Sequence, residues 1–378
     1  MEFRDLKQQY HVLKEDMDKA ISDVITRGAF IMGPQVRELE AQLAEYVGVK
    51  HCLTCANGTD ALTLALKAWG IGSGDAVFVP DFTFFSSAEV VPLEGATPVF
   101  VDVCEQTFNI DTNDLERAIK RILERGNLTP KVIVAVDHFG LPADYIRIRE
   151  IADRYGLLIL EDAAQGFGGE YNGRKACSFG DIATTSFFPA KPLGCYGDGG
   201  AVFTDNDEWA ALIESYRVHG KGTFKYDNVR IGLNSRLDTL QAAVLQVKLR
   251  AFKEYELEAI NVAAERYTSL LQGVVDTPLI PEGSYSSWAQ YTIKLQNAGE
   301  RDALQASLKA QGIPSMVYYP KPLHLQTAFK DVSLGEAKDI CPVSTALSSR
   351  VLSLPMHPYL NEEEITNVSN CIKSSLNR

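Results

Sequence analysis

A lysine lies between two prolines, just before a cluster of glycines, in the segment SFFPAKPLGCYGDGGA, residues 186–201. Pro189 and Pro192 restrict the backbone around Lys191, and the glycines let the chain turn tightly or let a ligand approach. A lysine that is held still and partly dehydrated has a lowered pKa, and its neutral amine can form a Schiff base with a carbonyl compound. The segment therefore predicts a reactive lysine, with the Ser186 hydroxyl nearby in the sequence.

Three more segments place chemically useful residues where expected strands end. Residues 57–60, NGTD, form a glycine turn before a helix, where free backbone N–H groups favour a phosphate, although an ordinary helix cap explains the segment as well. The aromatics in residues 81–85, DFTFF, can stack on a flat ring or pack in the core. Asp162 ends an apolar run, where a buried carboxylate needs a partner such as a protonated ring nitrogen; a structural role is the alternative.

Together these residues match the needs of one cofactor, pyridoxal phosphate. They offer a phosphate clamp, a stacking aromatic, a carboxylate for the pyridinium nitrogen and a lysine for the aldehyde. The carboxylate would keep the ring nitrogen protonated, and the lysine would also move a proton. The sequence has no G-x-G-x-x-G after its first expected strand and no G-x-x-x-x-G-K-[ST], which argues against dinucleotide and P-loop sites.

The elements that must position these residues follow an α/β pattern over the first 250 residues. Short apolar runs without polar alternation, typical of strands buried on both faces, alternate with helical stretches that often end in glycine. This alternation predicts a mainly parallel sheet with helices on both faces and a ligand site at the carboxyl ends of its strands. The expected strands are residues 51–56, 76–80, 98–102, 132–137, 157–161, 182–188 and 200–204.

The pattern changes after a long helical stretch, residues 237–271. Residues 287–295 read as a strand, residues 300–312 as a helix, and residues 312–320 as a further strand. We therefore expect a large cofactor-binding domain, residues 1–250, and a small C-terminal α+β domain, residues 251–378.

Composition narrows the class of protein. The 378 residues are 46% hydrophobic and 23% charged, with a formal net charge of −12, which weighs against binding to nucleic acid or to an anionic membrane. The seven cysteines do not suggest a disulfide framework, and Cys52 and Cys55, a lone C-x-x-C, fit a buried strand better than a metal or redox site. A second C-x-x-C at zinc-site spacing is absent, so no metal is expected. The charged first residues and the lack of a long apolar run predict a cytoplasmic protein.

Five motifs, in this order, resemble the DegT/DnrJ/EryC1/StrS family of sugar aminotransferases: NGTDAL, DFTFFSSAEVV, EDAAQGFG, SFFPAKPLGCYGDGGA and GLNSRLDTLQAA. The resemblance extends over nearly the whole chain. It implies the pyridoxal-phosphate fold type I of aspartate aminotransferase, with a mainly parallel seven-stranded sheet. It also implies a homodimer with shared active sites that passes an amino group from L-glutamate to a keto sugar of a nucleotide-linked hexose.

The resemblance also implies roles for individual residues. Lys191 would hold the cofactor aldehyde and act as the acid and base, Asp162 would bind the pyridine nitrogen, and Gln165 would lie by the ring hydroxyl. Phe84 would stack on the ring, and Asn234 would reach the phosphate from the other subunit. The full implied cofactor set is Gly58, Thr59, Phe84, Asp162, Gln165, Ser186, Lys191 and Asn234.

For the substrate, the motifs are most similar to the subgroup that acts on UDP-linked 3-keto N-acetylglucosaminuronic acid in O-antigen and lipopolysaccharide pathways. Arg236 would meet the carboxylate of the amino donor or of an acidic sugar. Ala190, Phe30 and Tyr318 depart from the subgroup's pattern and leave the substrate open. The implied substrate contacts are Gly28, Phe30, Arg236, Tyr318 and Tyr319.

Other functions remain open on the same fold. A C4 aminotransferase acting on a UDP- or dTDP-linked 4-keto-6-deoxy sugar is one, and a regulatory protein without turnover is another. Family dehydratases carry histidine in place of the lysine, so Lys191 argues against them. Basic residues before GLNSR form either a solvated loop or a loop that offsets the diphosphate charge; they are Arg217, His219, Lys221, Lys225 and Arg230.

Overall fold

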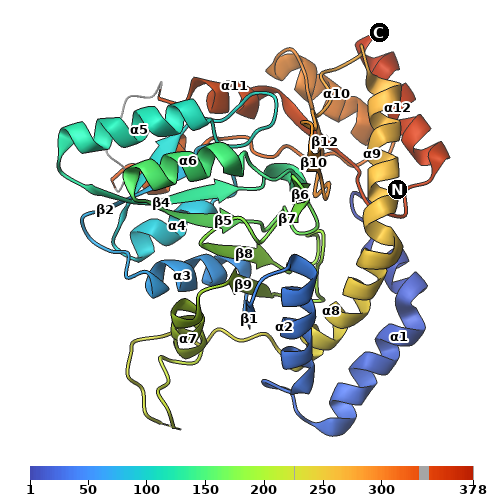
Figure 1. Ribbon diagram of the computed structural model, residues 1–378. Helices are drawn as coiled ribbons and strands as arrows, with labels where there is room; N and C mark the ends of the chain where they lie inside the picture. The colour runs from blue at the N-terminus through green and yellow to red at the C-terminus, as the bar shows by residue number, and fades with distance from the viewer. Residues whose placement is uncertain (225, 332–339, 378) are drawn as a thin grey trace.

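A seven-stranded sheet forms the centre of the computed structural model, which describes residues 1–224, 226–331 and 340–377 (Figure 1). Its strand order is β1-β9-β8-β5-β4-β2-β3, and only β9 runs antiparallel to its neighbours. The prediction of a mainly parallel sheet is confirmed, and each expected run forms one strand. The strands are β1 (His51–Cys55), β2 (Asp75–Pro80), β3 (Thr97–Val101), β4 (Thr129–Val136), β5 (Leu158–Asp162), β8 (Ile182–Ser186) and β9 (Gly200–Thr204).

Helices cover both faces of this sheet (Figure 1). Alternate strand residues point to opposite faces, so Val77 and Val79 join one apolar core while Ala76 and Phe78 join another. The first core packs under α3 (Gly58–Ala68), α4 (Ser86–Leu93) and α7 (Asp207–Tyr216). The opposite face is covered by α5 (Thr112–Arg125), α6 (Tyr145–Tyr155), α2 (Pro34–Val47) and α8 (Thr239–Ala251).

The C-x-x-C pair lies in β1, and its two thiols belong to different faces. Cys52 packs into the core beneath α2 and α8, and Cys55 packs into the core beneath α3. A spacing of three residues in a strand separates side chains in this way, so the two sulfur atoms cannot bind one metal ion from the same face. Both residues are buried free cysteines that fill the core.

The C-terminal part has a core of its own, built on a two-stranded antiparallel sheet. The predicted long helix is α8 continuing through a π-helical turn, η2 (Phe252–Glu256), into α9. Because the helix runs through residue 250, the division into two domains there stays a prediction. The elements are α9 (Leu257–Leu271), β11 (Tyr291–Lys294), α10 (Ala298–Ala310), α11 (Pro342–Arg350), β12 (Val351–Leu354) and α12 (Glu362–Leu376).

Smaller elements tie the chain ends and loops to this frame. The first helix, α1 (Leu6–Arg27), packs on α8 through Met17, Val244 and Val247. A small three-stranded sheet pairs β10 (Ser284–Tyr285) with β6 (Glu170–Tyr171), which pairs with β7 (Arg174–Lys175). Short helical turns lie in the loops: η1 (His138–Gly140), η3 (Leu323–Leu325) and η4 (Thr327–Phe329). Among the helices of the described ranges, none combines the length and apolar character that crossing a bilayer requires.

The strand expected at residues 312–320 is wrong. Only Met316 pairs there, in an isolated bridge to Ser353. Pro314 and Pro320 lack the N–H group that a sheet ladder needs, and the chain leaves the small sheet after Met316. The segment instead becomes the wall of a cavity.

Candidate active site

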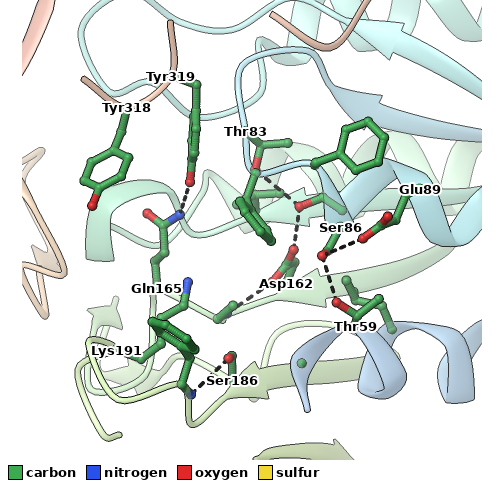
Figure 2. Close-up of a pocket in the computed structure, with 18 of the residues that line it drawn as sticks. Thr59, Thr83, Ser86, Glu89, Asp162, Gln165, Ser186, Lys191, Tyr318 and Tyr319 are labelled. Carbon is green, nitrogen blue, oxygen red and sulfur yellow. Dashed lines mark hydrogen bonds between the residues drawn. The ribbon is translucent and has the colours of Figure 1, made fainter. Parts of the chain in front are cut away.

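A cavity of about 830 Å³ lies at the carboxyl ends of β2, β4, β5 and β8. This is the edge at which open α/β sheets bind ligands. C-terminal residues complete the cavity, including Gln290 and the stretch 318–321. Figure 2 shows labelled side chains from the ends of β2, β5 and β8, together with Tyr318 and Tyr319, around one space.

Lys191 follows β8 and projects into this cavity (Figure 2). Its backbone N–H donates to the Phe188 carbonyl at 2.8 Å, so residues 188–191 form a closed turn. Burial lowers the pKa of the Lys191 amine to about 8, and the negative charge of Asp162 acts in the opposite direction. A substantial share of this amine is therefore neutral near physiological pH, as nucleophilic attack on an aldehyde requires.

Asp162 is the last residue of β5 and is almost fully buried. One carboxylate oxygen accepts a hydrogen bond from Ser87 Oγ at 2.7 Å, and the other accepts one from the Ala164 N–H at 3.2 Å. Burial nevertheless raises the pKa of the Asp162 carboxyl, because these two neutral donors only partly replace water. A cationic ring nitrogen in the cavity would supply the missing compensation, so the carboxylate fits that partner.

A small recess fits a phosphate group beside the start of α3. A Cβ atom added at Gly58 would lie only 2.8 Å from Ser186 Cβ, so glycine keeps this space open. Thr59 Oγ1 and Ser86 Oγ, 2.8 Å apart, place hydroxyl groups nearby, and both line the cavity. Asn57 Oδ1 accepts from the Asp60 N–H at 2.8 Å, so Asn57 also caps helix α3, as the alternative interpretation predicts. The helix N-terminus still favours an anion, because its first N–H groups have no partner within the helix.

The ring of a flat ligand would lie among Phe84, Gln165 and Tyr319. Phe84 lines the cavity and is half exposed, so it is available to stack on a ring. Phe82 is fully buried and packs in the core. Gln165 Nε2 donates to the Tyr319 hydroxyl at 3.0 Å, and Gln165 Oε1 accepts from the Phe139 N–H at 2.8 Å. Gln165 is thus held from two sides and has a fixed orientation at the cavity.

The remaining predicted substrate residues divide into two groups. Ala190, Tyr318 and Tyr319 line the cavity. Gly28, Phe30, Asn234 and Arg236 are not among the described residues that line it. Phe30 and Asn234 are exposed, and Arg236 Nη2 donates to Asn234 Oδ1 at 2.5 Å.

The basic loop after α7 does not act as one group. Arg217 is fully buried, and its guanidinium donates to Glu40 Oε1 and to the Thr54 carbonyl, both at 2.6 Å. Its charge therefore stabilises the fold and does not offset a ligand's charge. His219, Lys221 and Arg230 are exposed, and Lys225 lies outside the described residues.

Sequence reasoning missed several residues at the cavity. Ser87, which holds Asp162, and Glu89, whose Oε1 accepts from Ser86 Oγ at 2.9 Å, lie in the segment SSAE directly after the aromatics. Two serines at the start of an apolar helix were the available signal. Gln290 and Lys321 also line the cavity, but they come from the C-terminal part, where no local pattern indicates a ligand.

Comparison with known proteins agrees with this site. The family model of the DegT/DnrJ/EryC1/StrS aminotransferase family matches residues 11–373. The chain is 46% identical over 367 residues to UDP-2-acetamido-2-deoxy-3-oxo-D-glucuronate aminotransferase of Pseudomonas aeruginosa, covering 97% of each chain. It is 41% identical over 375 residues to UDP-N-acetyl-3-dehydro-alpha-D-glucosamine 3-aminotransferase of Acidithiobacillus ferrooxidans, covering 98% of this chain and 97% of the relative.

A solved structure extends the likeness to the fold. The crystal structure of a DegT DnrJ EryC1 StrS aminotransferase from Brucella abortus superposes with a TM-score of 0.96 and 51% identity, covering 100% of both chains. The chain is therefore an enzyme that uses pyridoxal phosphate to transfer amino groups to sugars. The chain belongs to the DegT/DnrJ/EryC1/StrS aminotransferase family.

Proposed function

We propose that this enzyme transfers the amino group of L-glutamate to the 3-keto group of a UDP-linked N-acetylated sugar, as a step in surface polysaccharide biosynthesis such as that of O-antigen or lipopolysaccharide. The observation that carries the proposal is the cavity that brings Lys191, Asp162 and the Gly58 recess together. The names of the two relatives support the 3-keto position and the UDP carrier. Seven free thiols and this pair of substrates fit a reaction in the cytoplasm.

Each residue has a task in the proposed site. Lys191 would hold the cofactor's aldehyde and move a proton at the reacting carbon, and Asp162 would keep the ring nitrogen protonated. When bound, the cofactor supplies an electron sink for the carbanion. Gln165 would face the ring hydroxyl and Phe84 the ring plane. Gly58, Thr59 and Ser186 would bind the phosphate through hydroxyl and N–H groups.

The proposed active form is a homodimer with shared sites. Asn234 and Arg236 do not line the cavity of their own chain, so they are free to serve the cavity of a second copy. The hairpin that leads to them extends away from the body after α7 (Figure 1). It exposes large apolar side chains, a pattern that marks an interaction surface; they are Phe224, Tyr226, Val229 and Ile231.

The acidic part of the substrate would be read at this shared boundary. Arg236 would bind a carboxylate, which a uronic acid or the glutamate donor provides. Tyr318 and Tyr319 would contact the sugar or nucleotide from the cavity wall, and Gly28 and Phe30 would contact it from outside the chain's own cavity. Amination at C4 of a 4-keto-6-deoxy sugar is the competing substrate choice.

The donor half of the reaction gives a direct test. Purified protein loaded with pyridoxal phosphate should be yellow, and L-glutamate should bleach the colour with release of 2-oxoglutarate. Lys191→Ala is the matched control, which should show neither the stable yellow form nor the bleaching. A protein that takes up the cofactor but ignores glutamate would instead support the regulatory alternative.

The acceptor is identified in the reverse direction. A panel of UDP-3-amino, UDP-4-amino and dTDP-4-amino sugars is offered with 2-oxoglutarate, and glutamate formation is measured for each. Fastest turnover with an acidic UDP-3-amino sugar is expected. Preference for a 4-amino sugar would overturn the proposed position of amination and leave the aminotransferase chemistry intact.

A further inference from the structure

Two neighbouring strands each end in a buried aspartate that reaches a C-terminal segment. Asp81 directly follows β2, and Asp102 directly follows β3. Asp102 accepts from the backbone N–H groups of Val343 and Ser344, both at 2.9 Å, and so fixes the start of α11. Asp81 makes the equivalent contacts with a different segment, and that segment carries part of the cavity wall.

Asp81 binds residue 324 through both of its oxygens. Oδ1 accepts from the His324 backbone N–H at 2.7 Å, and Oδ2 lies 2.6 Å from His324 Nδ1. The carbonyl oxygen of Asp81 also accepts from the Leu323 N–H at 2.9 Å. Asp81 itself is fully buried, and the His324 side chain is 5% exposed, so water competes little with these hydrogen bonds.

The segment held in this way forms one wall of the cavity. The wall, residues 318–326, contributes Tyr318, Tyr319, Pro320, Lys321, Leu323 and Gln326 to the cavity lining. Tyr319 accepts the hydrogen bond from Gln165, so the wall also touches the residue that faces the ring. Lys191 and Lys321 are the basic side chains among the described lining residues, so the wall brings a positive charge that suits an anionic substrate.

A metal ion is the competing explanation of this cluster. Asp81, His324 and Cys341 offer ligand atoms within 4.8 Å of one another. However, Asp81 Oδ2 and His324 Nδ1 are only 2.6 Å apart, a hydrogen-bond distance, whereas two atoms that each lie about 2 Å from one zinc ion are more than about 3 Å apart. Burial also raises the pKa of the Cys341 thiol and so disfavours the thiolate that binds metals.

We propose that Asp81 is a positioning residue that, through His324, holds the wall of residues 318–326 against the cavity and thereby sets the affinity for the nucleotide sugar. The proposal rests on the proposed function, because it assigns the wall to the sugar acceptor and not to glutamate. Loss of the contact leaves Lys191, Asp162 and Gly58 in place, since these three residues follow or end the strands β8, β5 and β1. The wall then samples other positions, and the binding of the acceptor weakens.

The experiment uses Asp81→Asn and Asp81→Leu in the cofactor-loaded full chain, with Asp102→Asn as the matched control. Binding of UDP-N-acetylglucosamine and of UDP-N-acetylglucosaminuronic acid is measured by calorimetry, and glutamate bleaching is followed by absorbance. Asp81→Leu should weaken nucleotide-sugar binding by about 10- to 100-fold and raise KM more than it lowers kcat. Asp81→Asn retains an oxygen for the His324 N–H and should recover part of the affinity.

Asp102→Asn should lower the melting temperature to a similar extent as Asp81→Asn and leave nucleotide-sugar binding unchanged. Equal loss of binding in both variants would overturn the proposal, because it would reduce Asp81 to a general contribution to stability. Unchanged binding in both Asp81 variants would also overturn it, as would stoichiometric zinc in the purified protein. If the wild type fails to react with glutamate, the proposed function is wrong, and this outcome is separate from the comparison of the variants.

Discussion

Two buried lysines, Lys191 and Lys248, have the same lowered pKa and very different surroundings. Burial lowers the pKa of each amine to about 8. Lys191 projects into a cavity that also holds a carboxylate and a phosphate recess. Lys248 lies in α8, with its amine 4.4 Å from the centre of the Tyr196 ring, and it does not line that cavity. A lowered pKa therefore identifies a dehydrated lysine, and the neighbouring residues decide whether it is reactive.

The largest expected difference between the two lysines is in turnover. Lys191→Ala should reduce kcat by at least about 1,000-fold, because it removes the group that we propose to hold the aldehyde and move the proton. Lys248→Met should leave kcat within about threefold of wild type, since Lys248 is not among the residues that line the cavity. Both are measured with glutamate and an amino acceptor. If kcat fell by a similar factor in both variants, the two lysines would not differ in catalytic importance.

Asp162→Asn tests what makes the surroundings of Lys191 special. An amide cannot stabilise a protonated ring nitrogen as a carboxylate does, so activity should fall by about 100-fold or more. The amide oxygen still accepts from Ser87, so the fold and the melting temperature should change little. Circular dichroism and steady-state kinetics measure the two effects. Near-normal turnover would mean that Asp162 has only a structural role.

The pKa of Lys191 predicts how the cofactor-free protein captures pyridoxal phosphate. Only the neutral amine attacks the aldehyde, so the capture rate should rise roughly tenfold between pH 7 and pH 9 and then level off. An ordinary lysine would show a rate that still increases steeply above pH 9. Stopped-flow absorbance gives the profile, and a plateau near pH 9 is the required result.

Mixing of two impaired variants tests whether the residues of one active site come from two subunits. Asn234→Ala should weaken cofactor retention, and subunit exchange with Lys191→Ala should place both native residues in one mixed site. At random exchange, about a quarter of the wild-type sites are then intact, with the corresponding recovery of activity. Native mass spectrometry verifies the exchange, and no recovery after proven exchange would contradict shared sites.

The smallest expected effect concerns stability around Lys248. Its folded pKa lies below its value of 10.5 in the unfolded chain, so the cost of burying the charge is complete below pH 8 and is relieved as the pH rises toward 10.5. The relief amounts to at most about 3 kcal/mol. As the pH rises from 8 to 10, the melting temperature of the wild type should therefore increase relative to that of Lys248→Met. A gap that does not vary with pH would show that Lys248 is not dehydrated.

The part of the site that belongs to strand ends could be predicted from the sequence. Lys191, Asp162 and Gly58 each follow an apolar run, and parallel strands bring their carboxyl ends to one edge. Ser87 was missed because a serine near a helix start has several ordinary explanations. The wall with Tyr319 and Lys321 lies more than a hundred residues further along the chain, and its place depends on long-range contacts that no local period encodes.

One incorrect expectation shows the same limit from the other side. Residues 312–320 have the apolar, aromatic composition of a strand, but Pro314 and Pro320 lack the N–H group of a ladder, and only Met316 pairs with another strand. Arg217 was also misjudged, because a basic residue next to other basic residues suggests a solvated patch. Its pairing with Glu40, 177 positions away in the sequence, exists only in the folded chain.

The buried Arg217 has a consequence for how this protein can change over evolution. It fixes the point at which the hairpin leaves the body, while the Ser235 hydroxyl, accepting from the Ala56 N–H at 3.1 Å, fixes the point of return. Insertions or exchanges between these two anchors leave the sheet undisturbed, because the strain of a new loop stops at the anchors. The segment between the two anchors can therefore change in sequence and length without loss of the sheet that carries the cavity.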